Sequence, residues 1–262
     1  MGSATTQALA SATTALVAAP AVDLAVAREL FAAARVLGGS SQLSGALADG
    51  AASDQARAKV VADVFGSLST TTRSLLTTVA TERWSHASDL VDGVEELAIR
   101  AASVAAPDDD VEGELFGVSR VVADNPDLEL ALGSRIGDAA AKGALVESLL
   151  TGRASAATAL IVSSLVQQPR ERRVRALLAR AMSIVADQRG RAVATVFVAA
   201  PLSAAQQTRL AAALTRRYGS RISLNTVVDP AVVGGVRVQI ADDLIDASVS
   251  TRLADLRQRL AG

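Results

Sequence analysis

The sequence predicts a mostly helical α+β protein, in which two consecutive helical bundles precede a small C-terminal α/β domain. Half of the residues are hydrophobic but only 2% are aromatic, so a core must be built from Ala, Val and Leu, which favours closely packed helices. Up to about residue 190, apolar residues recur at the spacings of 3, 4 and 7 that mark a buried helix face. Beyond that point they alternate with a period of two, which indicates strands.

Residues 1–106 are expected to form the N-terminal bundle of about six short helices. An uncharged helix is predicted over residues 4–19. Asp23 is expected to cap a second helix, which runs to Leu37 and ends at Gly38-Gly39. Serines are expected to cap two of the later helices in the same way, at Ser53 and Ser69.

Residues 107–190 are expected to form a second bundle related to the first by duplication. The segment Pro107-Asp108-Asp109-Asp110 marks the boundary, and beyond it the pattern recurs at an offset of 85 residues. A constant offset indicates an internal repeat, although two unrelated alanine-rich bundles remain the alternative. The recurring pairs are Glu29-Leu30-Phe31 with Glu114-Leu115-Phe116, Arg35-Val36 with Arg120-Val121, Leu43 and Leu47 with Leu128 and Leu132, Val60-Val61 with Leu145-Val146, and Val64-Phe65 with Leu149-Leu150.

Residues 191–262 are expected to form the small α/β domain. Alternation predicts strands over residues 193–198, 222–227 and 236–240, and Asp229-Pro230 ends the second of them because proline lacks an amide donor. Gly234-Gly235 indicates positive φ or very close backbone packing. A hairpin is the simplest interpretation of residues 222–240.

The final helix is predicted from an apolar seam with spacings of 4, 3 and 4, formed by Val249, Leu253, Leu256 and Leu260. A small sheet needs a cover for its apolar face, and we assign that role to Val249 and Leu253. Leu256 and Leu260 lie further out, where they could offer an apolar ledge to a partner.

Composition argues against an enzyme. Cysteine is absent and His86 is the only histidine, and its neighbours provide no nucleophile, so we expect it at the surface or at a helix end. No glycine-rich phosphate loop occurs, and Asp242, Asp243 and Asp246 are better explained by a turn than by a metal site. We therefore expect no catalytic residues, no cofactor and no metal.

The net charge is −1, which gives no overall field for nucleic acid. The most basic segment, residues 170–180, has two interpretations: an arm that binds nucleic acid, or a helix face exposed to solvent. We prefer the solvent-exposed face, because the segment lacks the aromatic residues that stack on bases. Its arginines are Arg170, Arg172, Arg173, Arg175 and Arg180. There is neither a signal-like segment nor a run of about 18 apolar residues, so we expect a protein of the cytoplasmic side without direct membrane insertion.

The C-terminal third resembles a known family. The order aliphatic, Asp229, Pro230, aliphatic, Gly234, Gly235 and then an alternating strand is similar to the signature of the ATP synthase delta subunit, whose mitochondrial counterpart is the oligomycin-sensitivity-conferring protein. The preceding strand, residues 193–202, and a following helix with Gln206 or Gln207 extend the resemblance.

The resemblance implies a non-catalytic peripheral-stalk subunit of a proton-translocating F-type ATP synthase, at the cytoplasmic face of the cell membrane. In that family the N-terminal bundle holds the alpha subunits of the catalytic head, and the C-terminal domain holds the membrane-anchored b subunits. The first bundle resembles the family's N-terminal domain through Arg73, Leu76 and Arg83, so we expect head contacts at these residues and Trp84, and b contacts at Leu256 and Leu260.

Two other classes remain open from the residues alone. One is a helical-repeat interaction scaffold unrelated to ATP synthase. The other is a nucleic-acid-binding regulator that uses the arginine segment, for which salt-dependent DNA binding would be the signature.

Overall fold

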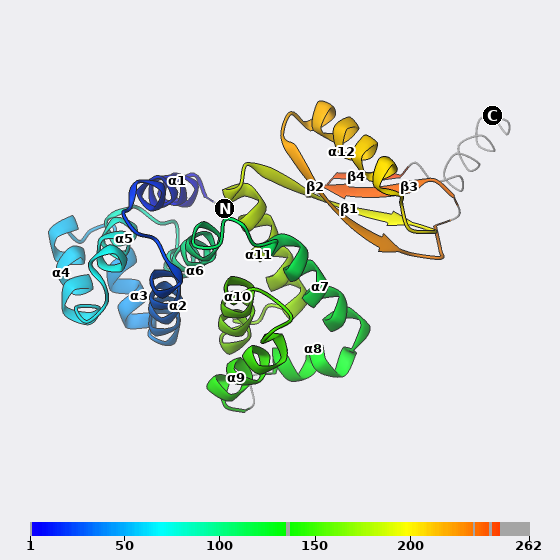
Figure 1. Ribbon diagram of the computed structural model, residues 1–262. Coiled ribbons are helices and arrows are strands. Elements are labelled where there is room, and N and C mark those ends of the chain that lie inside the picture. The colour runs from blue at the N-terminus through cyan, green and yellow to red at the C-terminus, as the bar shows by residue number, and fades with distance from the viewer. Residues whose placement is uncertain (1, 135–136, 233, 241–242, 247–262) are drawn as a thin grey trace, which may run out of the picture. The chain divides into compact units, whose positions relative to one another are not determined.

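The computed structural model describes residues 2–134, 137–232, 234–240 and 243–246. Over these residues the chain forms twelve helices and one four-stranded sheet near the C-terminus (Figure 1), which confirms the predicted fold class. The chain divides into two compact units, residues 1–185 and 186–262.

The first unit begins with six helices that match the predicted bundle. Asp23, Ser53 and Ser69 cap α2, α4 and α5 through side-chain oxygens that accept backbone N–H groups, as predicted. One predicted boundary is wrong: α2 continues through the glycine pair, because neither glycine takes up positive φ and Ser40 ends the helix instead. The helices are α1 (Ser3–Ala18), α2 (Leu24–Gly39), α3 (Ser41–Ala48), α4 (Asp54–Val64), α5 (Thr70–Thr81) and α6 (Ala87–Val104).

Five further helices repeat the order and approximate lengths of α2–α6. Asp110 caps the first of them by accepting the backbone N–H of Gly113. The starts of corresponding helices lie 85 to 87 residues apart, close to the repeat found in the sequence. These helices are α7 (Val111–Asp124), α8 (Pro126–Gly133), α9 (Ala139–Leu150), α10 (Ala156–Gln167) and α11 (Val174–Gln188).

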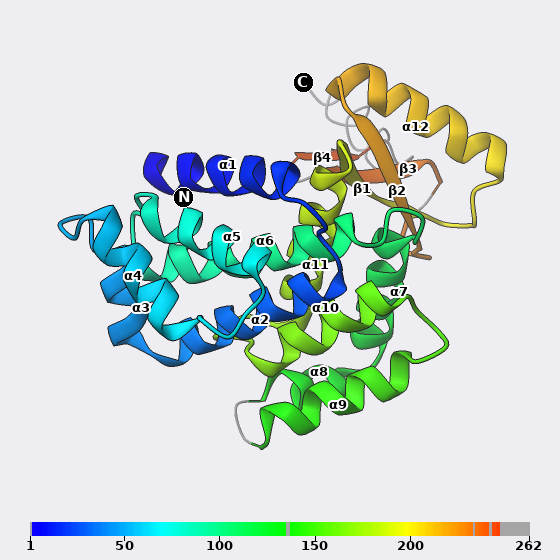
Figure 2. The ribbon, with the colours of Figure 1, turned by 60° about the vertical axis from the view of Figure 1, so that its left-hand side comes forward.

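Helix α6 joins the two sets of helices. Every residue from Leu90 to Ser103 except Asp92 is buried, as expected for a helix that is surrounded by other helices. It packs on α1, α2, α3 and α5 and also on α10 (Figures 1 and 2). One continuous apolar core runs through both sets. The predicted boundary between residues 106 and 107 therefore falls inside one compact unit, and a separate second domain stays a prediction.

The arginine-rich segment packs against α6 instead of forming a solvated face. Arg172 donates two hydrogen bonds to Glu95, each 2.8 Å long, and Arg170 pairs with Asp92. Arg180 lies 3.3 Å from Glu96. The expectation of a solvated helix face is wrong for these three arginines, because the carboxylates that neutralise them lie on a helix about 80 residues earlier in the chain. Their pairing also leaves little charge for nucleic acid.

The second unit contains a mixed sheet of strand order β2-β1-β3-β4. Its elements are β1 (Arg191–Val198), α12 (Ala204–Tyr218), β2 (Arg221–Val228), β3 (Val236–Ile240) and β4 (Asp243–Asp246). Strands β1 and β2 run parallel, whereas β3 is antiparallel to both β1 and β4. The predicted hairpin of residues 222–240 is wrong, since β3 pairs with β1. Alternation of apolar and polar residues identifies which face of a strand is buried, but it does not identify which other strand pairs with it.

Helix α12 connects the two parallel strands and covers one face of the sheet. Ala194, Val196 and Val198 of β1 pack with Leu214 of α12 in this second core. Ser203 and Gln206 form a reciprocal capping box at the start of α12. Of the two glutamines that carry the resemblance, Gln206 is therefore the helix cap, whereas the Gln207 side chain donates to the carbonyl of Leu202 at 3.1 Å.

Candidate partner-docking surfaces

The Asp229-Pro230 signature ties the end of β2 to β1. The Asp229 N–H donates to the carbonyl of Val198 at 2.8 Å, and the Asp229 carboxylate accepts the N–H of Ala231 at 2.9 Å. Gly234 and Gly235 have φ of 66° and 75°, which confirms the predicted left-handed conformation and explains why glycine stands at both positions. The signature therefore fixes the conformation of the loop that follows β2.

Arg237, the basic residue of β3, contacts both this loop and the sheet. Its guanidinium lies 4.6 Å from the centre of the Phe197 ring and 3.6 Å from the Asp229 carboxylate. The stacking and the ion pair both hold the loop against the sheet.

The four residues predicted for head contact do not form one exposed patch. Leu76 is 3% exposed and Trp84 is 7% exposed, and the Trp84 indole N–H donates to the carbonyl of Val79 at 2.8 Å. Arg73 is half-buried, and Arg83 is exposed. Leu76 and Trp84 could therefore influence a partner only through the packing of the bundle, whereas the two arginines are accessible. Leu256 and Leu260 lie outside the described residues.

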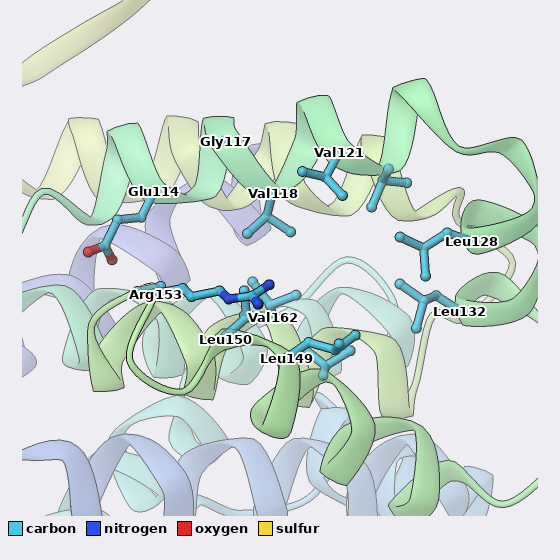
Figure 3. A pocket seen from close by; sticks show the side chains of 13 residues that line it. Glu114, Gly117, Val118, Val121, Leu128, Leu132, Leu149, Leu150, Arg153 and Val162 are labelled. Carbon is cyan, nitrogen blue, oxygen red and sulfur yellow. The ribbon is translucent and has the colours of Figure 1, made fainter.

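An apolar groove of about 360 Å³ opens in the second set of helices (Figure 3). Val121 of α7 is 54% exposed and Leu149 of α9 is 46% exposed, and both line the groove. Arg153 extends from the loop after α9 toward the middle of the groove. Among the described residues its side chain has no hydrogen-bond or ion-pair partner. The remaining lining residues are Glu114, Gly117, Val118, Val122, Leu128, Leu132, Val146, Leu150, Ala154 and Val162.

The corresponding space in the first bundle is filled, and no room for a water molecule remains there. Five positions are shared between the two sites. Three of them carry larger side chains in the first bundle: Leu37 for Val122, Phe65 for Leu150 and Leu76 for Val162. The other two, Leu47 with Leu132 and Val61 with Val146, are the same in both. The smaller side chains account for part of the open volume of the groove.

The two bundles share a hydrogen-bonded glutamate. Glu29 accepts from the Ser69 N–H, from the Ser69 hydroxyl at 2.6 Å and from the Thr72 hydroxyl at 2.5 Å. Glu114 accepts from the same three groups of Ser155 and Thr158, again at 2.6 and 2.5 Å for the hydroxyls. This identical arrangement, 85 to 86 residues apart, supports the duplication.

The hydrogen bonds also set the charge of both glutamates. Burial alone would raise the pKa of Glu29, but the hydrogen bonds from Ser69 and Thr72 outweigh it and the pKa falls below its usual 4.5. Burial and the hydrogen bonds from Ser155 and Thr158 act on Glu114 in the same way, and its pKa is also lowered. Both carboxylates are therefore ionised near neutral pH.

The described residues meet the requirements of neither a metal-binding cluster nor a membrane-spanning helix. No group of three or more His, Asp or Glu side chains there is placed to hold a metal ion. His86 is exposed and stands immediately before α6, as predicted. Among the described residues, no helix combines the length and the apolar character needed to cross a bilayer.

The fold and these surfaces define a class: a mostly helical protein with a small α/β end domain and an apolar groove open at the surface of its helical part. Comparison with known families identifies it further. The chain belongs to the ATP synthase delta (OSCP) subunit family, whose model matches residues 97–260. The match includes α7–α11 and the sheet. Of the first six helices it includes only the end of α6.

Relatives match over all or most of the chain. ATP synthase subunit delta from Leifsonia xyli subsp. xyli is 48% identical over 264 residues and covers 100% of both chains. That from Streptomyces avermitilis is 44% identical and covers 90% of this chain and 88% of its own. A chain of the Toxoplasma gondii mitochondrial ATP synthase hexamer aligns with 64% of this chain and 97% of its own, at 23% identity and a TM-score of 0.39.

Sequence reasoning missed the groove between α7 and α10. A signal was available in the repeat alignment, because Phe65 is replaced by Leu150 and Leu37 by Val122 at otherwise matching core positions. A loss of volume at several positions of one repeat indicates either a looser core or a site that something else fills.

Proposed function

We propose that this protein is a peripheral-stalk subunit of a proton-translocating F-type ATP synthase, which ties the catalytic head to the membrane-anchored b subunits. The observation that carries the proposal is membership of the delta (OSCP) family, with full-length relatives named ATP synthase subunit delta. In such a stalk, the subunit contributes binding at both ends and no chemistry. Rotor torque would otherwise turn the head together with the rotor.

The partners in this proposal are the alpha subunits of the head and the C-terminal region of the b subunits, at the cytoplasmic face of the cell membrane. The sheet unit carries the family's signature loop and is assigned to b. The first bundle is assigned to the head through the surface around Arg73 and Arg83, as expected from its sequence. The family match over residues 97–260 supports the rival assignment of the head contact to the second bundle.

The proposal is tested by stripping the protein from membranes without detergent and adding it back. Stripped membranes should lose ATP-driven proton pumping while ATP hydrolysis by the head persists, and the full chain should restore pumping. Cross-linking of the restored membranes, followed by mass spectrometry, should identify alpha and b peptides. Failure to rebind, or neighbours outside the synthase, would support the unrelated helical scaffold instead.

Fluorescence of Trp84, the only tryptophan in the sequence, distinguishes the two assignments of the head contact. It lies in the first bundle, packed against Gly93 of α6. A peptide of the alpha N-terminus that docks on the first bundle should change Trp84 emission in the full chain. Binding without any change in emission would favour the second bundle.

A further inference from the structure

The sequence contains two Asp-Gly dipeptides, and their local structures differ. Asp49-Gly50 lies in the turn between α3 and α4, whereas Asp92-Gly93 lies inside α6. An Asp-Gly sequence is chemically reactive, because the glycine has no Cβ to keep its nitrogen away from the carboxyl carbon of the preceding aspartate. The proposed function assigns no chemistry to either dipeptide.

The turn after α3 leaves the reacting groups of Asp49-Gly50 accessible to each other. The Asp49 carboxylate folds back along the backbone that follows it and accepts the N–H of Ala51 at 2.9 Å. The Ala52 N–H closes the turn by donating to the carbonyl of Asp49 at 3.2 Å. Asp49 and Gly50 are both exposed, and among the described residues the Gly50 N–H has no acceptor. The carboxyl group therefore lies beside a peptide nitrogen that no other contact holds.

Helix α6 constrains the same dipeptide at Asp92-Gly93. Inside an α-helix the Gly93 N–H donates to the carbonyl four residues earlier. The Asp92 carboxylate pairs with Arg170 and lies 3.7 Å from the Arg172 guanidinium. A Cβ at Gly93 would collide with the ring of Trp84, so the backbone there is also covered. Nitrogen, carboxylate and backbone are all engaged in other contacts at this second dipeptide.

We propose that Asp49-Gly50 is a site of spontaneous conversion to isoaspartate in the folded protein, whereas Asp92-Gly93 is protected by its helix. The Gly50 nitrogen attacks the Cγ atom of Asp49, and the carboxyl hydroxyl takes up the amide proton and leaves as water. A five-membered succinimide ring is formed. Water then opens the ring at either of its two carbonyl groups, which gives back Asp49 or leaves isoaspartate. One water molecule is released and one is consumed, so the conversion needs no oxidant, reductant or other reactant.

The conversion lengthens the connection between α3 and α4. In isoaspartate the backbone passes through the side-chain carboxyl, which adds one carbon atom to the chain and leaves the former main-chain carbonyl as the free carboxylate. The turn lies beside Arg83, because a Cβ at Gly50 would be 3.7 Å from the Arg83 Nη2 atom. Arg83 is assigned to the head contact, so the converted chain is altered next to that surface. The reaction itself does not depend on the proposed function, and either can fail without the other.

Water enriched in heavy oxygen tests the site, since ring opening places one oxygen atom from water in the residue whichever product forms. The folded full chain is kept in this water at neutral pH and physiological temperature for several weeks, and its peptides are analysed by mass spectrometry. The peptide with Asp49 should gain label and a fraction of isoaspartate. The peptide with Asp92 should gain label at least about tenfold more slowly, because reaction there requires local opening of α6. In urea, where neither local structure persists, both peptides should be labelled at similar rates.

Gly50→Ala is the matched variant. Gly50 is not among the glycines with positive φ, and a Cβ there meets nothing closer than 3.7 Å, so the variant should fold normally. Its labelling at Asp49 should be about tenfold slower, because the Cβ hinders the nitrogen and narrows the accessible backbone conformations.

Three results would each overturn the proposal. The first is equal labelling of Asp49 and Asp92 in the folded chain. The second is no labelling of Asp49 in the folded chain over a period in which the chain in urea is labelled. The third is unchanged labelling of Asp49 in Gly50→Ala, which would show that the glycine is not what makes this aspartate reactive.

Discussion

The two helical bundles have the same plan but differ in how their cores are completed. The first bundle fills the space between its helices with Leu37, Phe65 and Leu76, whereas the second has Val122, Leu150 and Val162 there and leaves a groove. Both keep the glutamate that binds a Ser and a Thr at the start of the fourth helix of the repeat. The two bundles therefore share the hydrogen bonds that position the helices and differ in the side chains between those helices.

The largest expected effect is a cavity in the filled core. Leu37→Ala should lower the free energy of unfolding by about 3 kcal/mol, because it removes buried methyl groups and leaves an empty space. Val122→Ala at the equivalent position should cost roughly half as much, because fewer atoms are lost and the groove is already open beside it. Urea unfolding of the full chain followed by circular dichroism measures both. Equal losses would mean that the groove is packed like the first core.

The next effect concerns the ion pairs between the arginine-rich segment and α6, which form the joint between the two bundles. Arg172→Ala should cost about 2 kcal/mol, since it leaves the nearly buried Glu95 with only the more distant Arg170 and Arg180. The matched control is the exposed pair of Arg120 with Asp124, and Arg120→Ala should change stability by less than about 0.5 kcal/mol. Unfolding in urea at low and high salt compares them. Similar losses for the two variants would show that the joint contributes no more than a surface ion pair.

A smaller effect comes from exchanging one side chain between the bundles. Leu76→Val should cost about 1 kcal/mol, because one methylene of the filled core is lost. The reverse change, Val162→Leu, should be neutral or stabilise by up to about 0.5 kcal/mol, because the added methylene extends toward open space. Thermal unfolding of the two variants decides this. A clear loss of stability in Val162→Leu would show that the wall of the groove is already tightly packed.

The smallest difference is expected for the shared glutamates. Glu29→Gln and Glu114→Gln should each cost about 1 kcal/mol at neutral pH and should cost the same, because both lose charged acceptors for the same three donors. The folded-state pKa of each is lowered, so their contribution is present above about pH 4.5 and is lost as the pH falls through the folded pKa. Both variants should therefore lose less stability than the unaltered chain between pH 7 and about pH 3, a range that extends below the usual glutamate pKa.

Unfolding curves at the two pH values provide the measurement for the glutamates. A loss confined to one of the two variants would break the equivalence of the bundles at this position. An unchanged pH dependence in both would show that the hydrogen bonds do not favour the ionised carboxylates.

The sequence by itself determined the elements and the repeat. Caps at Asp23, Ser53, Ser69 and Asp110 are local, since each side chain accepts the N–H of the third residue after it, and local interactions can be read from the order of residues. The positive φ of Gly234 and Gly235 was predictable for the same reason. The 85-residue offset needed only a comparison of the chain with itself.

Tertiary structure alone decided which surfaces meet. The partners of Arg170, Arg172 and Arg180 lie on α6, about 80 residues away, and β3 pairs with β1 although β2 precedes it in the chain. Leu76 and Trp84 turned out to be buried, while the groove beside Arg153 remained open. Periodicity specifies that a face is apolar, but what covers that face depends on the distances between helices, and these are set by the packing of the whole unit.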